Sequence, residues 1–280
     1  MPTVTPRIGD NVLSQATHPV RDDLGMTPTD HDALRDLLVS EGAAVLQEPI
    51  SFVRFTGKDE ADVLLNDLDG HPHAFLFACL VDRQVPAEWA WSVPATVRDR
   101  LGSFAMDDLV ALNEAEWVDL MRKPTPAHRL PETMASVLYL AAQRVVSRYD
   151  GNAANIWSDT PSSATIVRRF LEFHGAGPKI ATMAANILVR HFHVPLRDYR
   201  YIDISADSQV QRVMGRLGFV EPGSSPEVIV YAARELNPEF PGIFDLALWD
   251  LGRSTCRPTA PLCSSCRLVD YCGYAAGHRD

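Results

Sequence analysis

The sequence predicts an all-α protein, and three observations support this prediction. Apolar residues recur at helical spacing through most of the 280 residues, most clearly between Met134 and Tyr149. Proline and glycine stand at nearly every junction between these periodic stretches. Outside residues 51–56, which are ambiguous between strand and loop, no stretch alternates convincingly as a strand does. With 46% hydrophobic residues, the chain has enough apolar side chains for one large or two modest domains.

The elements are predicted in order from these patterns. Residues 1–25 lack periodicity and mix Pro, Gly, Thr and Asp, so we expect a flexible N-terminal arm. The first helix is expected to begin near Thr29 or Asp30, both of which suit an N-cap. The periodicity predicts further helices over 72–83, 89–101, 106–111, 114–121, 131–149, 163–173, 179–191, 208–217, 226–236 and 242–251.

The charge distribution bears on the class of partner. A net charge of −10 argues at first against nucleic acid, because phosphate binding depends on Lys and Arg. However, residues 1–70 hold 5 basic and 13 acidic side chains, whereas residues 168–220 hold 8 basic and 4 acidic ones. The acidity therefore belongs to the N-terminal quarter, and a locally basic segment remains available for a phosphate backbone.

Membrane insertion is not expected. The longest apolar run, residues 74–81, is far shorter than the roughly 20 residues of a membrane-spanning helix. The first residues do not read as a secretory leader. A cytoplasmic location is therefore the expectation.

The segment "FHGAGPKIA", which begins at Phe173, interrupts two helical stretches. Gly175 and Gly177 permit positive φ and close approach of another backbone, and Pro178 suits the first position of a helix. The free N–H groups of such a helix start bind phosphate oxygens without reading bases. Lys179 is unusual there, because a cation opposes the helix dipole. An ordinary corner between two helices remains the alternative.

Four cysteines crowd into 17 residues with the spacing C-x6-C-x2-C-x5-C, whereas Cys79 stands alone and is expected to be a buried small hydrophobe. Four thiolates in one short segment favour a metal centre over disulfides, which a reducing cytoplasm does not preserve. Zinc is the chemical alternative to an iron–sulfur cluster. The predicted ligands are Cys256, Cys263, Cys266 and Cys272.

The hairpin resembles the helix-hairpin-helix of the endonuclease III family of DNA glycosylases, which reads L-P-G-V-G-x-K-T-A. "FHGAGPKIA" retains both glycines, the lysine and the alanine, whereas His174 and Ile180 depart from the pattern. The resemblance implies that Lys179 is the nucleophile that attacks C1′ of the damaged nucleotide. An amine nucleophile captures C1′ as a Schiff base.

The segment "ADSQVQRV", from Ala206, resembles the family motif V-D-T-H-x-x-R-V, with Gln209 in place of histidine. The resemblance implies that Asp207 is the essential aspartate, whose carboxylate stabilises the oxocarbenium character of the sugar. Asp207 is also a good N-cap for the helix over 208–217. Asp203, four residues earlier, is the competing candidate.

The cysteine spacing resembles the [4Fe–4S] loop that closes the endonuclease III fold. The resemblance makes Arg257 and Arg267 candidates for phosphate contact, with a solvated face as the alternative.

"FLFACLVDRQVPAEWAW" resembles the early helix that ends L-S-A-Q-A-T-D, which aligns Gln84 with the glutamine that fills the gap left by a flipped base. Phe77 stands where the adenine-specific branch carries a glutamate, which argues against an adenine glycosylase.

The resemblance covers residues 65–275 and implies two helical domains. Residues 71–217 are expected to form a six-helix barrel domain with the hairpin, and residues 26–70 and 218–280 an iron–sulfur cluster domain. The expected function is a DNA glycosylase of base-excision repair with AP lyase activity, by default on oxidised pyrimidines. Two alternatives remain: a glycosylase without lyase activity or with another base specificity, and a non-catalytic DNA-binding protein that retains the fold.

The partner is expected to be double-stranded DNA that contains a damaged base or an abasic site. The protein is expected to act as a monomer, without a membrane, and to associate with the nucleoid when bound to DNA.

Overall fold

The computed structural model describes residues 28–277, and within this range the regular structure is helical, with no strand. The prediction of an all-α fold is therefore confirmed. The α-helices are α1 (Pro28–Gln47), α2 (Asp59–Asn66), α3 (Pro72–Val81), α4 (Ala87–Trp91), α5 (Val93–Leu101), α6 (Met106–Ala111), α7 (Glu114–Arg122), α8 (Pro131–Tyr149), α9 (Ser163–Leu171), α10 (Pro178–Phe192), α11 (Ser208–Leu217), α12 (Pro226–Leu236), α13 (Asp245–Ser254) and α14 (Gly273–Ala276). The predicted N-terminal arm, residues 1–25, lies outside the described residues.

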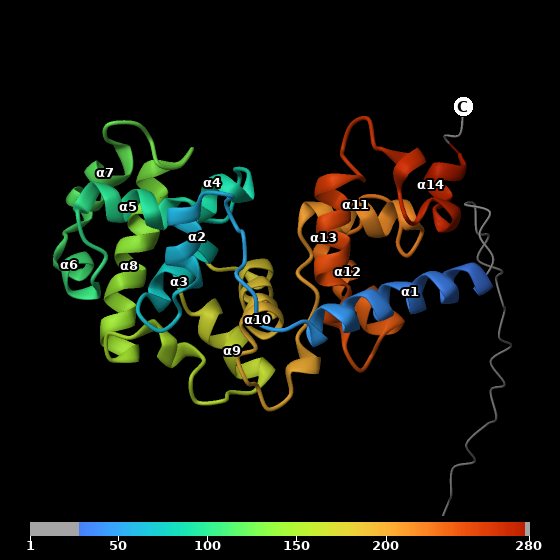
Figure 1. Ribbon diagram of the computed structural model, residues 1–280, viewed down its shortest axis with the longest axis horizontal. Helices are drawn as coiled ribbons and strands as arrows, with labels where there is room; N and C mark the ends of the chain where they lie inside the picture. The colour runs from blue at the N-terminus through green and yellow to red at the C-terminus, as the bar shows by residue number, and fades with distance from the viewer. Residues whose placement is uncertain (1–27, 278–280) are drawn as a thin grey trace, which may run out of the picture.

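The helices form two lobes that lie side by side (Figure 1). In the first lobe, α2, α4, α5, α8 and α10 pack around α3, all of whose residues are buried. A helix that is apolar on every face has to be enclosed, and "PHAFLFACLV" provides such a surface. The C-terminal end of this enclosed helix therefore has a fixed position, which matters for the site described below.

The second lobe combines the two ends of the described chain. Leu34 and Leu38 of α1 pack in one core with α11, α12 and α13. Figure 1 shows α1, in blue, lying along the red and orange C-terminal helices. The long α1 thus crosses from the first lobe to the far side of the second, and the chain between α10 and α11 makes the return connection.

The two hydrophobic cores divide the chain differently from the predicted domain boundaries at two places. Ala61, Leu64 and Leu65 of α2 belong to the first core, although residues 26–70 were assigned to the cluster domain. Conversely, Val210 and Val213 of α11 belong to the second core, although the barrel domain was extended to residue 217. The physical reason is that α2 presents its apolar face to α3 and α5, and α11 packs against α13.

Three local predictions need correction. The segment 51–56, which the sequence leaves open between strand and loop, is neither strand nor helix, and the helix α2 that follows it was not predicted. The helix predicted over 89–101 is divided into α4 and α5 at Ser92. Pro94 explains the division, because it has no N–H to donate to the carbonyl four residues earlier. The helix predicted over 242–251 begins as a 3-10 turn and becomes α13 at Asp245.

Within residues 28–277, no helix combines the length and the apolarity needed to cross a membrane.

Candidate active site between the two lobes

The hairpin between α9 and α10 is a tight turn whose shape depends on Gly175. Its φ of +84° is a conformation that side-chain-bearing residues rarely adopt, and a Cβ there would lie 2.9 Å from Arg83 Nη2. The Arg83 guanidinium donates a hydrogen bond to the Gly175 carbonyl, which ties the hairpin to the residue that follows the end of α3. Gly177, by contrast, is the extended N-cap of α10 with φ −110°, and open space surrounds its Cβ position. Of the two glycines that permit positive φ, Gly175 adopts it and Gly177 does not.

Lys179 lies in the first turn of α10 and forms an ion pair with Asp82. The Nζ atom lies 2.8 Å from Asp82 Oδ2, and the side chains are 32% and 11% exposed. Asp82 is the C-cap of α3, so each charge opposes the dipole of its own helix. The pair therefore joins two positions that helix stability alone would not select.

Asp207 is the N-cap of α11, as predicted. Its Oδ1 accepts hydrogen bonds of 2.8 Å from the backbone N–H groups of Gln209 and Val210. Burial raises the pKa of the Asp207 carboxyl above its ordinary value, although those two hydrogen bonds and the Lys179 charge act in the opposite direction. The local sequence thus places an incompletely solvated carboxylate beside the hairpin.

Asp203, the competing candidate, is engaged elsewhere. Arg234 of α12 holds its carboxylate through two hydrogen bonds of 2.7 and 2.8 Å. Neither of the two cavities described next is lined by Asp203. The geometry of the site therefore favours Asp207 of the two aspartates.

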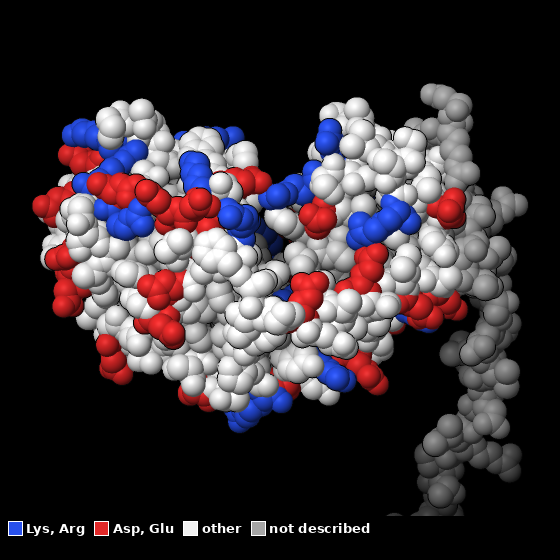
Figure 2. Space-filling view, viewed as in Figure 1, with Lys and Arg blue, Asp and Glu red and all other residues white. Residues whose placement is uncertain are grey.

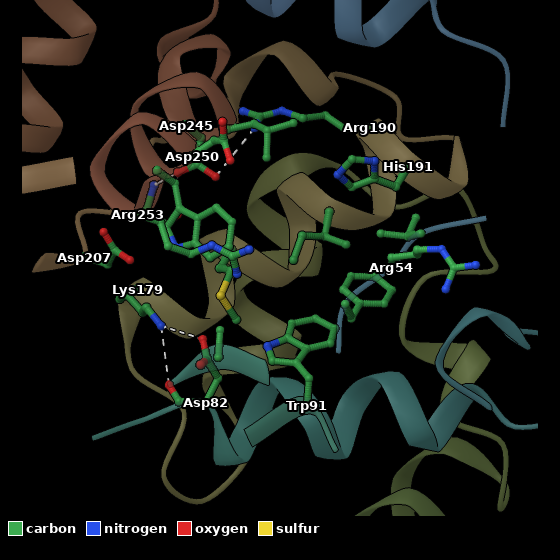
Figure 3. Close-up of a pocket in the computed structure, with 18 residues that line it drawn as sticks. Arg54, Asp82, Trp91, Lys179, Arg190, His191, Asp207, Asp245, Asp250 and Arg253 are labelled. Atoms are coloured by element: carbon green, nitrogen blue, oxygen red, sulfur yellow. Dashed lines mark hydrogen bonds and ion pairs between the residues drawn. The ribbon is translucent and has the colours of Figure 1, made fainter. Parts of the chain in front are cut away.

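Two adjoining cavities lie between the lobes, and Asp82, Lys179 and Asp207 line both. Figure 3 shows the residues that line the inner one. The inner one has a volume of about 300 Å³ and an apolar wall that includes Trp91 and Trp249. The outer one, about 810 Å³, is more open. Figure 2 shows the corresponding hollow between the lobes, with Lys and Arg side chains at its edge although the protein as a whole is acidic. Positively charged side chains are thus present at the edge of this hollow.

Gln84 lies at the edge of the outer cavity in an unusual conformation. Its φ is +57°, which costs a side-chain-bearing residue conformational energy. The Arg129 guanidinium donates a 3.0 Å hydrogen bond to Gln84 Oε1. Gln84 therefore projects from the short connection between α3 and α4, close to Lys179 and Asp207 in the lining of one cavity.

A polar network forms the deep wall of the inner cavity and connects the lobes. Arg190 of α10 donates to the Gly242 carbonyl and lies 3.6 Å from Asp245 Oδ2. Asp245 Oδ1 accepts hydrogen bonds from the backbone N–H and the hydroxyl of Ser205. Beside them, burial lowers the pKa of His191 to about 4, so its imidazole is neutral at physiological pH. This wall offers hydrogen-bonding groups in a mainly apolar cavity.

The cysteine segment contains the four predicted metal ligands, Cys256, Cys263, Cys266 and Cys272. Its four cysteines are free thiols, and Arg216 donates a 3.3 Å hydrogen bond to Cys256 Sγ. Arg216 also holds the carbonyls of Arg257 and Pro258, at 2.7 and 3.0 Å. In the part of the chain that the structure describes, however, no three Cys, His, Asp or Glu side chains are arranged to hold a metal ion. The donor chemistry fits an iron–sulfur cluster, but the thiols do not converge on a common point.

The two arginines of this segment differ. Arg267 forms a bidentate ion pair with Glu41 of α1, at 2.8 and 2.9 Å, so its charge is already neutralised. Arg257 is exposed, and its Nε donates to the Ser254 carbonyl at 3.1 Å. Neither lines the cavities between the lobes. The expectation of a phosphate contact is therefore not supported for Arg267.

Sequence reasoning missed Asp82, and it also missed the aromatic and polar walls of the inner cavity. A signal for Asp82 was present, because an acidic residue directly after the apolar run 74–81 opposes the dipole at a helix C-terminus. No comparable signal marks Trp91, Trp249 or the Arg190 network. These residues come from three separate helices, α4, α13 and α10, and only the fold brings them together.

Known proteins resemble this chain in sequence and in fold. No protein-family model matches the chain. Endonuclease III of Sulfolobus acidocaldarius is 30% identical over 136 residues, which are 46% of this chain and 56% of the relative. Endonuclease III of Thermotoga maritima is 33% identical over 72 residues, 25% of this chain and 33% of the relative. The chain therefore spans little more than half the length of the first relative and a third of the second.

Solved structures share the fold over most of the chain. A non-covalent endonuclease III–DNA complex aligns with a TM-score of 0.61 at 18% identity and covers 88% of this chain and 97% of that chain. A thermostable thymine-DNA glycosylase aligns with a TM-score of 0.57 at 16% identity, with coverages of 90% and 100%. A trapped endonuclease III–DNA covalent intermediate gives 0.56 at 19% identity, with coverages of 78% and 95%. At these identities the structural likeness shows the fold alone. The chain is therefore similar in sequence to two endonuclease III proteins and shares its fold with solved structures of endonuclease III and of a thymine-DNA glycosylase.

Proposed function

We propose that the protein is a DNA glycosylase of base-excision repair with AP lyase activity. The observation that carries this proposal is that Lys179 and Asp207, from two different helix starts, line the same cavities between the lobes. The relatives are endonuclease III enzymes, and the structures of similar fold include one of a trapped covalent intermediate with DNA.

Lys179 and Asp207 have complementary roles in this proposal. The amine of Lys179 attacks C1′ of the nucleotide, the bond to the base breaks, and the base leaves with the electron pair. Asp207 stabilises the positive charge that develops on the sugar. The resulting Schiff base permits elimination of the 3′ phosphate, which gives the lyase activity. The raised pKa of Asp207 reflects a poorly solvated carboxylate, whose field acts strongly on a nearby cation.

The DNA partner follows from the access that this chemistry requires. C1′ of a stacked nucleotide is unreachable within the duplex, so the base has to be extruded. We propose that the inner cavity, of about 300 Å³, receives it, since binding pockets for small ligands begin near this volume. We propose that Gln84 fills the gap in the duplex. The backbone N–H groups that follow Gly175 and Gly177 would bind the phosphates.

The deciding experiment is borohydride trapping on a duplex that contains one abasic site. The whole sequence has three lysines, Lys58, Lys123 and Lys179, so an adduct can be mapped without ambiguity. We expect wild-type protein to form a covalent adduct that Lys179→Ala abolishes. Lys123→Ala is the matched control, because Lys123 is 72% exposed and pairs with Asp119 outside the cavities. A wild-type protein that forms no adduct would overturn the lyase assignment.

The substrate is the finer part of the proposal. We propose oxidised pyrimidines as the first class to test, with the protein acting as a monomer on double-stranded DNA in the cytoplasm, where it associates with the nucleoid. Structures of similar fold also include a thymine-DNA glycosylase and an 8-oxoguanine glycosylase/lyase, so mismatched and oxidised purine duplexes belong in the same screen. Release of a base without strand cleavage would indicate a monofunctional glycosylase. Binding without release of any base would favour the non-catalytic alternative.

We further propose that Cys256, Cys263, Cys266 and Cys272 hold a [4Fe–4S] cluster with a structural, DNA-facing role. The four free thiols within 17 residues support this proposal, as does the hydrogen bond from Arg216 to Cys256 Sγ. Anaerobic purification should give iron and acid-labile sulfide, and Cys263→Ser should reduce both. Cys79→Ala is the matched control, because Cys79 is completely buried in the other core. Stoichiometric zinc without sulfide would overturn the assignment.

A further inference from the structure

The Lys179–Asp82 pair occupies a position that helix stability alone does not explain. Lys179 carries a positive charge at the positive end of α10, and Asp82 carries a negative charge at the negative end of α3. The two residues are 97 positions apart in the chain, and their charged atoms meet at 2.8 Å. Each charge is compensated by the other residue rather than by its own helix.

The backbone holds Asp82 opposite Lys179. The Asp82 N–H donates to the Cys79 carbonyl at 3.3 Å, which closes the end of the enclosed helix α3. The next residue, Arg83, donates to the Gly175 carbonyl of the hairpin. The Arg83–Gly175 hydrogen bond therefore links the end of α3 to the hairpin beside the pair, and Figure 3 shows both contacts of Lys179 with Asp82 as dashed lines.

We propose, on the basis of the function proposed above, that Asp82 positions Lys179 and accepts the proton that its amine must lose before it attacks. In the part of the chain that the structure describes, Asp82 is the only residue whose side chain hydrogen-bonds to Lys179 Nζ. Asp207 lines the same cavities, but its Oδ1 is occupied by two backbone N–H groups. The two carboxylates therefore have separate roles. Asp82 accepts a proton from the Lys179 nitrogen, and Asp207 faces the sugar.

Entry of the nucleotide makes the proton transfer favourable. The pair lies in a cavity wall beside Trp91 and Met183, and a nucleotide placed there would displace water from both charges. Two separated charges are costly in such surroundings, and transfer of one proton from Nζ to Oδ2 removes both charges. Before DNA binds, Asp82 Oδ2 holds Lys179 Nζ at 2.8 Å in a partly exposed ion pair.

On an abasic site, formation of the Schiff base conserves atoms and charge. The Lys179 ammonium gives one proton to Asp82, and the freed lone pair forms the bond to C1′ of the open-chain aldehyde. Asp82 donates that proton to the former carbonyl oxygen. The oxygen then takes a second proton from the nitrogen and leaves as water. The product is a protonated imine, with Asp82 again a carboxylate. Borohydride then reduces the imine by delivering a hydride to C1′.

Chemical rescue distinguishes this role from a structural one. We expect Asp82→Ala to slow single-turnover adduct formation by about 10²–10⁴-fold, the contribution typical of general acid–base catalysis, with the affinity for the abasic duplex unchanged. Sodium formate should restore much of the rate, because the missing side chain leaves room for a small carboxylate at the cavity wall. Asp82→Glu should also recover part of the rate. Asp119→Ala is the matched control, since Asp119 pairs with an exposed lysine in the same manner.

Each remaining outcome counts for or against the proposal. If Asp82→Ala fails to fold, Asp82→Asn preserves the shape without the basic oxygen and should be slow, while its circular dichroism and melting temperature match those of the wild type. A wild-type rate in either variant would overturn the proposal and leave the glycosylase assignment intact. A slow Asp82→Ala that neither formate nor Asp82→Glu restores would assign the pair a structural role only. Absence of any wild-type adduct would overturn both proposals.

Discussion

The hairpin side of the cleft and the cysteine segment differ in how completely the polypeptide builds them. At the hairpin, Lys179 meets Asp82, and Asp207 caps α11, so the functional groups are held by other protein groups. In the cysteine segment, the best-defined contacts run from Arg212 and Arg216 to backbone carbonyls. The thiols there are not arranged as a set of metal ligands within the described residues.

The difference has a physical cause. A cap or an ion pair needs a donor and an acceptor, and the chain supplies both. Four thiolates repel one another, so they converge only around a cation that balances their charge. Cys266 and Cys272 pack at the edge of the second core, and burial raises the pKa of each thiol. A cleft built in this way is preorganised, whereas the cysteine segment depends on its proposed cluster.

Among the variants that test this comparison, Asp207→Asn is expected to have the largest effect. Asp207→Asn should slow base release and adduct formation by about 10²–10³-fold, because it removes a preorganised charge from the transition state. The same change should raise the melting temperature at pH 7. The folded-state pKa of Asp207 is raised, so its ionisation opposes folding at pH 7, and this opposition disappears as the pH falls below the ordinary value of 3.8.

Single-turnover kinetics and melting curves at pH 7 and near pH 4 check both parts of this prediction. Asparagine retains the N-cap, so a loss of helix stability is not expected to mask the gain. Asp203→Asn is the matched control and should retain the wild-type rate, because Asp203 pairs with Arg234 away from the cavities. A slow Asp203→Asn beside an active Asp207→Asn would reverse the assignment of the two aspartates.

The parts of the site that depend on neighbouring residues were predictable from the sequence. Pro178 opens α10 and Asp207 caps α11, and each effect acts within one turn of helix. The helix pattern was predictable for the same reason, apart from α2 and the division at Ser92. The pairing of Asp82 with Lys179 and that of Arg267 with Glu41 were not predictable. They depend on contacts across 97 and 226 positions, and no periodic pattern encodes such pairing.

The two hairpin glycines provide a smaller but sharper test. Gly175→Ala should destabilise the protein by about 1–2 kcal/mol, because alanine is strained at positive φ, and its Cβ would press on Arg83. DNA affinity should fall with it, since Arg83 would have to move away from the hairpin. Gly177→Ala should have little effect on stability, because its φ is ordinary and its surroundings are open. Denaturant unfolding and binding to an abasic duplex measure both quantities. Equal losses in the two variants would contradict the geometry of the turn.

The hydrogen bonds from Arg216 to the cysteine segment allow a test of the other region of the comparison. Arg216→Ala removes the hydrogen bonds to the Arg257 and Pro258 carbonyls, each worth about 1 kcal/mol. We expect faster loss of iron to a chelator, with adduct formation by freshly prepared protein nearly unchanged, because the hairpin region does not depend on this contact. Arg234→Ala, which removes a surface ion pair, is the control. Unchanged iron retention in Arg216→Ala would show that the segment is ordered without these hydrogen bonds.

The smallest expected effect separates Arg257 from Arg267 and tests which side of the molecule binds the phosphate backbone. Each phosphate contact contributes about 0.9 to the slope of log affinity against log salt concentration. Arg267→Ala should leave that slope unchanged, because Glu41 already neutralises the charge. Arg257 is exposed and forms no ion pair with any described carboxylate, so Arg257→Ala should reduce the slope by about 0.9 if the cysteine segment contacts DNA. Titration of an abasic duplex at several salt concentrations measures the slopes. If neither variant changes the slope while Arg129→Ala does, DNA contacts the hairpin side alone, and the role of the cysteine segment is limited to holding the second lobe together.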